Sequence, residues 1–166
     1  MNRAISLIIA ATLIAPASAM ALGSIAPATI ENLNGAEISF PKAFNGTPSL
    51  AILLFEHGQQ EQANEAIALL DAAQKKNPQL KWVEFPLIGE PPVLVRFMIR
   101  DGMREAISEH HQAHVFPLFT EKDAWRKEAD VGNSTAPLLA KLDEKGAILK
   151  VEKLTSFHTA EDILAF

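Results

Sequence analysis

The sequence predicts an α/β domain in which a mixed central β-sheet is flanked by helices on both faces. The first observation behind this is the run Leu50–Phe55, which is wholly apolar and bounded by turn residues, as in a strand covered on both sides. The second is the order of patterns, because strand and helix alternate through most of the chain before two strands follow one another directly. Alternation gives parallel neighbours, whereas a closing hairpin adds antiparallel strands.

Each element follows from local spacing. Alternating residues indicate half-buried strands, apolar residues three and four positions apart indicate helices, and Asn77-Pro78 ends the first helix. Thr120 and Thr159 are the residues expected to cap two later helices. The expected elements are strands over 36–40, 50–55 and 81–87, helices over 60–76 and 93–109, a short strand over 115–119, a helix over 121–129, a hairpin of strands over 137–142 and 148–153, and a closing helix over 160–164.

The N-terminal segment is typical of a cleavable signal peptide. Arg3 supplies a positive start, the apolar run at 4–14 is too short to cross a bilayer, and Ala17-Ser18-Ala19 is a small-residue cleavage site. We therefore expect a periplasmic or secreted protein whose mature form has no transmembrane segment. The expected boundaries are a cleaved signal peptide over 1–19, a loose lead-in over 20–35 and a folded domain over 36–166.

Composition excludes two classes of function. The chain has 166 residues, a formal charge of −5 and no cysteine. An acidic protein has no overall field that attracts nucleic acid, so nucleic acid is not an expected partner. Without a thiol the chain cannot act as a thiol oxidoreductase, and we expect no cofactor.

The order of elements, together with certain residues, resembles the thioredoxin-like superfamily, close to its peroxiredoxin and thiol-peroxidase branch. The matching residues are Phe116-Pro117-Leu118-Phe119-Thr120, then Val131, then Ala136-Pro137, then Leu142-Asp143 with Gly146 and Ile148. The resemblance covers residues 36–166. It implies a thioredoxin-like sheet with the central strand in its middle and a cis peptide bond before Pro137.

The chain departs from that family at the site that defines it. Gln60 and Ala63 stand at the positions of the two redox cysteines, so the resemblance carries no redox activity over. What it does imply is a groove for an extended peptide at Thr135, Ala136 and Pro137.

A narrower resemblance rests on two short segments. Residues 55–62, which include Gln59-Gln60, and residues 100–104 resemble cysteine-poor relatives of the mitochondrial ATP synthase assembly factor. This resemblance implies a role in assembling a membrane complex.

Histidines offer two candidate sites. His110 and His114 would share one face of a helix, where two imidazoles can bind zinc, although no third ligand is evident and a solvated surface is the plainer interpretation. His57 follows the central strand, next to Glu56 and near Glu61, and this trio could act as general acid and base. No nucleophile accompanies it, which favours an ordinary polar loop.

Arg96, Arg100 and Arg104 recur every four residues on the second helix. Acidic neighbours on the same helix favour a solvated charged face. The alternative is a docking stripe for an acidic partner or for anionic lipid headgroups.

These observations together predict an exported thioredoxin-fold protein without redox cysteines. We expect it to be a non-catalytic binding or assembly module for a protein partner, which a membrane complex could provide. Two alternatives remain open, namely an enzyme of unknown type that uses His57 and neighbouring carboxylates, and a weak metal-binding protein that uses His110 and His114.

Overall fold

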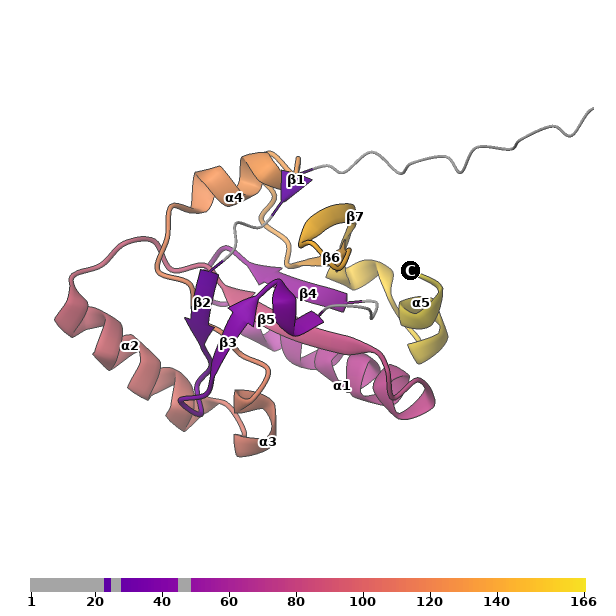
Figure 1. The fold of residues 1–166 in the computed structure, drawn as a ribbon, viewed down its shortest axis with the longest axis horizontal. Coiled ribbons are helices and arrows are strands. Elements are labelled where there is room, and N and C mark those ends of the chain that lie inside the picture. Colours follow the sequence, from indigo (N-terminus) through magenta and orange to yellow (C-terminus); the bar gives the residue numbers. More distant parts are fainter. Residues whose placement is uncertain (1–22, 25–27, 45–48) are drawn as a thin grey trace, which may run out of the picture.

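A computed structural model of the chain describes residues 23–24, 28–44 and 49–166. Its main sheet has five strands in the order β1-β7-β6-β4-β5, and β2 and β3 form a separate hairpin (Figure 1). The strands are β1 (Gly23–Ser24), β2 (Ala28–Glu31), β3 (Glu37–Phe40), β4 (Ser49–Leu54), β5 (Lys81–Pro86), β6 (Leu138–Leu142) and β7 (Ala147–Lys153). The α-helices are α1 (Gln60–Lys76), α2 (Val93–Ala106), α3 (Glu109–Gln112), α4 (Lys122–Glu128) and α5 (Ala160–Ala165).

Strand β4 occupies the interior position that its apolar run predicts. All six of its residues are buried. It pairs in parallel with β5 and antiparallel with β6, and β6 pairs antiparallel with β7. The sheet is therefore mixed, with the parallel pair built through α1 and the antiparallel strands added by the C-terminal hairpin.

The two faces of the sheet carry separate hydrophobic cores. On one face α1 packs with the inner stripe of alanine and leucine that its spacing predicted, and α5 joins it through Ile163 and Phe166. On the other face Phe40 of β3, Phe116 and Trp125 of α4 pack against Phe85 of β5. Helices therefore flank both faces of the sheet, as expected.

The outer edge of β5 is covered by the segment that was expected to be a strand over 115–119. This segment makes only two isolated bridges, Glu84 to Val115 and Leu87 to Leu118, so it is an extended edge and not a continuous strand. The backbone N–H of Phe116 donates to Glu84 at 2.9 Å, and that of Leu118 donates to Pro86 at 2.9 Å. Pro117 is tolerated because a proline at an edge can face away from its neighbour.

The region expected to be a loose lead-in contains structure. Gly23–Ser24 pair with β7 at the outer edge of the sheet, and Ala28–Glu31 pair with β3 in the hairpin. Residues 28–31 therefore form a strand that pairs with β3, where the sequence had predicted only a loose lead-in. The signal peptide expected over 1–19 lies outside the described residues.

Helix ends differ from expectation in two places and agree in one. Helix α2 ends at Ala106, and α3 begins separately at Glu109, instead of one helix running through residue 109. Glu121, not Thr120, occupies the N-cap position of α4, without a side-chain cap. Thr159 does cap α5, and it forms a reciprocal capping box with Asp162.

The peptide bond before Pro137 is trans, which corrects the cis bond that the family resemblance implied. In the described residues the only cis bond is Phe40–Pro41. Ser134 Oγ accepts a hydrogen bond from the Ala136 N–H at 3.3 Å, and the Pro137 carbonyl accepts one from Leu154 at 2.9 Å. A local turn therefore precedes β6, and the chain enters this strand in an extended conformation.

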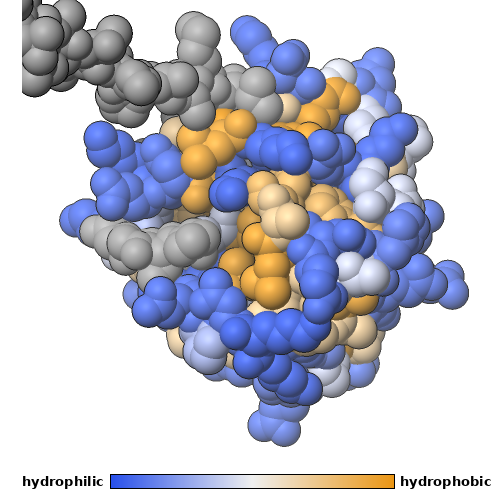
Figure 2. All heavy atoms as spheres, turned by 90° about the vertical axis from the view of Figure 1, so that its right-hand side faces the viewer, coloured by the Kyte–Doolittle hydropathy of each residue, from blue (hydrophilic) through white to orange (hydrophobic). Residues whose placement is uncertain are grey.

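The face that carries α5 is shown in Figure 2. Hydrophilic side chains form most of its rim, and apolar atoms gather in a strip across the middle. None of the helices in the described part of the chain is both long enough and apolar enough to cross a membrane.

Candidate functional site

The loop between β4 and α1 is held by one buried glutamine. The Gln59 side-chain oxygen accepts hydrogen bonds from the backbone N–H groups of Phe55 at 2.7 Å and Glu56 at 3.1 Å. Its amide nitrogen donates to the Thr135 carbonyl at 2.9 Å. Gly58 makes the turn at a φ of 102°, which glycine adopts without strain. Gln59 therefore ties the end of the central strand to the segment before β6.

The positions matched to the redox cysteines lie at the start of α1. Gln60 is the first residue of the helix and is partly exposed, whereas Ala63 is fully buried in the first turn. The Gln60 amide donates to Asn64 at 3.3 Å. An amide and a methyl group at these positions can hydrogen-bond and pack, but they cannot exchange electrons or disulfides.

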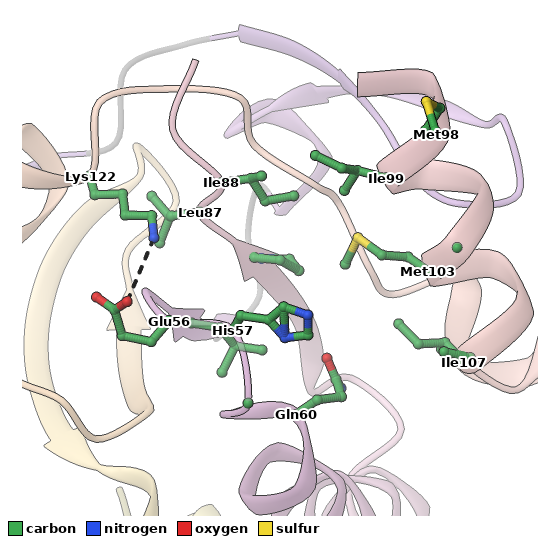
Figure 3. A pocket seen from close by; sticks show the side chains of 15 residues that line it. Glu56, His57, Gln60, Leu87, Ile88, Met98, Ile99, Met103, Ile107 and Lys122 are labelled. Atoms are coloured by element: carbon green, nitrogen blue, oxygen red, sulfur yellow. Dashed lines mark ion pairs between the residues drawn. The ribbon is translucent and has the colours of Figure 1, made fainter. Parts of the chain in front are cut away.

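An apolar cavity of about 560 Å³ opens beside Gln60. Ile99 and Met103 of α2, and Ile107 just after it, project toward His57 and Gln60 on the other side (Figure 3). Apolar residues at the ends of β4 and β5 complete the lining, and the polar residues at the mouth are Glu56, His57, Gln60 and Lys122. The volume lies in the range of small-ligand sites, and the walls suit an apolar guest.

His57 and Glu56 do not form an acid–base pair. The Glu56 carboxylate accepts a hydrogen bond from Arg126 at 2.6 Å and lies 3.9 Å from Lys122 Nζ, as the dashed line in Figure 3 marks. Across residues 28–44 and 49–166, His57 has no hydrogen bond to a carboxylate. The arrangement fits the polar loop better than the enzyme that Glu56, His57 and Glu61 could have formed.

The sheet beside this loop carries a buried carboxyl group, that of Glu84. The residue is 0% exposed, and neither of its oxygens has a hydrogen-bond partner in the described residues. Burial raises the pKa of Glu84 to about 7, although the nearby Gln60 amide and the charge of His111 act in the opposite direction. Glu84 is therefore a protonatable group within the core, close to Gln60 at the start of α1.

Thr135, Ala136 and Pro137, where the resemblance implied a peptide groove, lie next to this loop, but the Thr135 carbonyl and the Ala136 N–H are already engaged. The Thr135 carbonyl accepts from Gln59, and Ser134 holds the Ala136 N–H. A second hollow of about 500 Å³ adjoins them. An extended peptide would have to compete with these internal hydrogen bonds, so the peptide groove stays a prediction.

The arginines of α2 make hydrogen bonds within the protein, so they are not a purely solvated face, although Arg104 also pairs with Asp101 at 2.8 Å; the docking stripe stays a prediction. Arg100 donates to the carbonyls of Glu31 and Asn32 at 3.2 and 3.0 Å, and its side chain is only 15% exposed. Arg104 donates to the Leu33 carbonyl at 2.6 Å. Arg96 donates to Pro91 and lies over the ring of Phe119. Helix α2 is thus bound to the end of β2.

We expect Arg100→Gln to lower the free energy of unfolding by about 1–2 kcal/mol, because charge-assisted hydrogen bonds to partly buried carbonyls are lost. Urea unfolding measures the change, and hydrogen exchange of residues 28–40 should report a loosened hairpin. Glu105→Gln, an exposed change on the same helix, is the control. Equal stability of the two variants would contradict the anchoring role.

Because the arginine face of α2 lies against the protein, apolar side chains elsewhere on the helix are exposed to solvent. Val93, Leu94, Phe97 and Met98 are 64%, 74%, 61% and 69% exposed, and we call these four residues the α2 apolar face. Met98 also lines the cavity, so this face and the cavity are continuous. Helix α2 lies at the side of the molecule, beside β2 (Figure 1).

His110 and His114 have different main neighbours in the structure. His114 stacks on Trp82 with ring centroids 4.1 Å apart, and its Nδ1 lies 3.0 Å from the Trp82 carbonyl. His110 instead joins His111 and Asp71, whose potential ligand atoms all lie within 4.8 Å of one another. His110 also lies edge-on to His114, with ring centroids 6.4 Å apart, so the two rings are neighbours and their use as a metal-ligand pair stays a prediction.

Sequence reasoning missed three features of this region, namely Glu84, the α2 apolar face and Asp71. The apolar residues Leu94, Phe97 and Met98 share one side of a helix, a signal that could have been found by plotting α2 as a wheel. Glu84 and Asp71 carry no such local signal, because their significance depends on neighbours far away in the chain.

Comparison with known proteins supports the fold alone. No protein-family model and no curated protein matches the chain. Among solved structures, an exposed lipoprotein thioredoxin from Streptococcus pneumoniae has a TM-score of 0.57 at 11% identity, over 84% of this chain and 96% of its own. A putative electron transfer protein from Aquifex aeolicus has a TM-score of 0.59 at 11% identity, over 88% and 96%.

A third neighbour is BsSco, described as a member of the Sco family of cytochrome c oxidase assembly proteins. It has a TM-score of 0.56 at 14% identity and covers 86% of this chain and 90% of its own. The chain thus has the thioredoxin-like fold, and it has that fold without a single cysteine.

Proposed function

We propose that this protein is an exported, non-catalytic binding module that holds an apolar segment of a protein partner. The observation that carries the proposal is the α2 apolar face, which leads through Met98 into the cavity beside the former redox position.

The exposed side chains are the kind that anchor protein contacts. Exposed apolar residues that gather on one surface mark interaction sites more often than scattered ones do, and an aromatic ring is a common anchor. Phe97 and Leu94 stand out from the helix, and none of the residues of α2 is fully buried. Binding would remove this apolar surface from water, which is the source of the affinity.

The rest of the site supports binding over catalysis. The cavity walls are apolar, and Glu56 at the mouth is neutralised by Arg126 and Lys122. The Sco neighbour is a precedent for an assembly role on this fold, in line with the resemblance to relatives of the ATP synthase assembly factor. The partner would then be a subunit of a membrane complex that presents an apolar segment outside the bilayer.

Site-specific photocrosslinking tests the docking surface in the native host. A photoreactive residue at Phe97 should yield one dominant adduct with a partner protein, whereas the same residue at Lys145, an exposed turn position, should not. Leu94→Ser together with Phe97→Ser should reduce capture of that partner at least tenfold, with the unfolding transition preserved. Adducts between two copies of the chain would instead show self-association and contradict the proposal.

Export is tested separately by the size and place of the mature chain. We expect the protein in the periplasmic or secreted fraction, with an intact mass that corresponds to cleavage after Ala19. A full-length chain in the cytoplasm would contradict export and leave the docking test unaffected.

A further inference from the structure

We propose that Asp71, His110 and His111 form a binding site for a divalent transition-metal ion, with Zn²⁺ as the ion that suits the donors best. We call these three residues the α1–α3 site. It is independent of the α2 apolar face, and it lies where the first long helix meets the short helix α3.

Two elements bring the three side chains together. Asp71 lies on α1, and His110 and His111 are consecutive residues of α3. His111 Nε2 lies 3.1 Å from Asp71 Oδ2, close to the separation of about 3.3 Å between two donors that each lie about 2.05 Å from a tetrahedral zinc ion. The full set of donor atoms lies within 4.8 Å, so the exposed His110 ring needs only a rotation to complete it.

The orientation of His111 is set by neighbours that would not themselves bind the ion. Ser108 Oγ lies 3.0 Å from His111 Nδ1, which directs Nε2 toward Asp71. Such a partner on the second ring nitrogen is a regular feature of metal-bound histidines. The Trp82 ring lies edge-on to His111 at 6.4 Å and supports it from the core side.

The donor set decides which ions fit. Two imidazoles and one carboxylate suit Zn²⁺ and similar ions with a water in the fourth position, whereas Mg²⁺ and Ca²⁺ prefer oxygen ligands alone. An ion at this site would tie α3, and through it the turn after α2, to α1.

Zinc titration of the mature protein with a competing chelator tests the site. The wild type should bind one Zn²⁺, and both Asp71→Asn and His110→Ala should weaken binding at least tenfold, since loss of even an outer partner costs 10- to 100-fold. His158→Ala, a change at an exposed histidine near α5, should bind as the wild type does. Circular dichroism and urea unfolding confirm that each variant is folded.

Two direct readouts complement the affinities. Co²⁺ in place of zinc should show the intense visible bands of a tetrahedral site, and ring-nitrogen NMR should show zinc-dependent shifts at His110 and His111 but not at His57 or His158. Zinc binding that survives both ligand variants, or that shifts other histidines, would overturn the proposal, as would the absence of stoichiometric binding by the wild type.

Discussion

We expect Glu84→Gln to make the protein more stable than the wild type by about 2–4 kcal/mol at pH 8, and by no more than about 1 kcal/mol at pH 5. This is the first of the two largest effects that we expect. It follows from burial of the Glu84 carboxyl, which raises its pKa from 4.5 to about 7.

The sign follows from proton binding. Because the pKa is raised in the folded state, the folded protein binds a proton more tightly than the unfolded chain does. Stability is therefore highest below about pH 4.5, falls as the pH rises toward 7, and then levels off once the carboxyl is ionised in both states. Glutamine has nearly the same shape and no charge, so the variant avoids the cost of burying the ionised form.

Urea unfolding at several pH values between 5 and 8 measures the effect. The wild type should lose stability across this window, and Glu84→Gln should lose less. Glu144→Gln, a change at an exposed turn carboxyl, is the matched control and should follow the wild type. Parallel pH profiles for wild type and Glu84→Gln would contradict a raised pKa at Glu84.

Gln59→Ala should lower the free energy of unfolding by about 2–4 kcal/mol, because the buried N–H of Phe55 and the partly buried N–H of Glu56 lose their acceptor. The Thr135 carbonyl also loses its donor, so the β4–α1 loop and the segment before β6 should separate. Alanine at this position cannot reach any of the three groups.

Urea unfolding gives the size of the loss, and hydrogen exchange locates it. Amides 55 and 56 should exchange faster in Gln59→Ala, whereas amides within α1 should change much less. Gln62→Ala removes an exposed glutamine from the same helix and serves as the control. If both variants unfold alike, Gln59 does not hold the loop.

Local spacing was sufficient for the elements that its own residues determine. The bounds of α1 agree with the spacing of Ala63, Ile67 and Leu70, and the apolar run of β4 agrees with an interior strand. In both cases the pattern and the burial are properties of the same short segment, so no distant contact is needed to interpret them.

Features that depend on distant partners could not be predicted in this way. The spacing of Arg100 and Arg104 predicts that they share one helix face. It does not predict that they donate hydrogen bonds to the carbonyls of Asn32 and Leu33. Glu84 occupies a polar position in an alternating strand, and only the packing of α1 over that strand makes it buried. Gln60 does begin α1, as its spacing predicted, whereas the glutamine that holds the β4–α1 loop is the preceding residue, Gln59.

The hydrogen bonds from α2 to the end of β2 have a consequence for the order of folding. The β2–β3 hairpin is made early in synthesis, yet Arg100 and Arg104 lie 68 and 71 residues beyond the carbonyls of Asn32 and Leu33 that they hold. The Leu33 N–H donates a hydrogen bond to the carbonyl of Val115, which is synthesised later still. Contacts of such high sequence separation form only after a large loop has closed. A chain that emerges from its N-terminus onward therefore carries an unsecured hairpin until residue 115 has appeared, so β2 and β3 are fixed in place only after β4, β5 and α2 have been made.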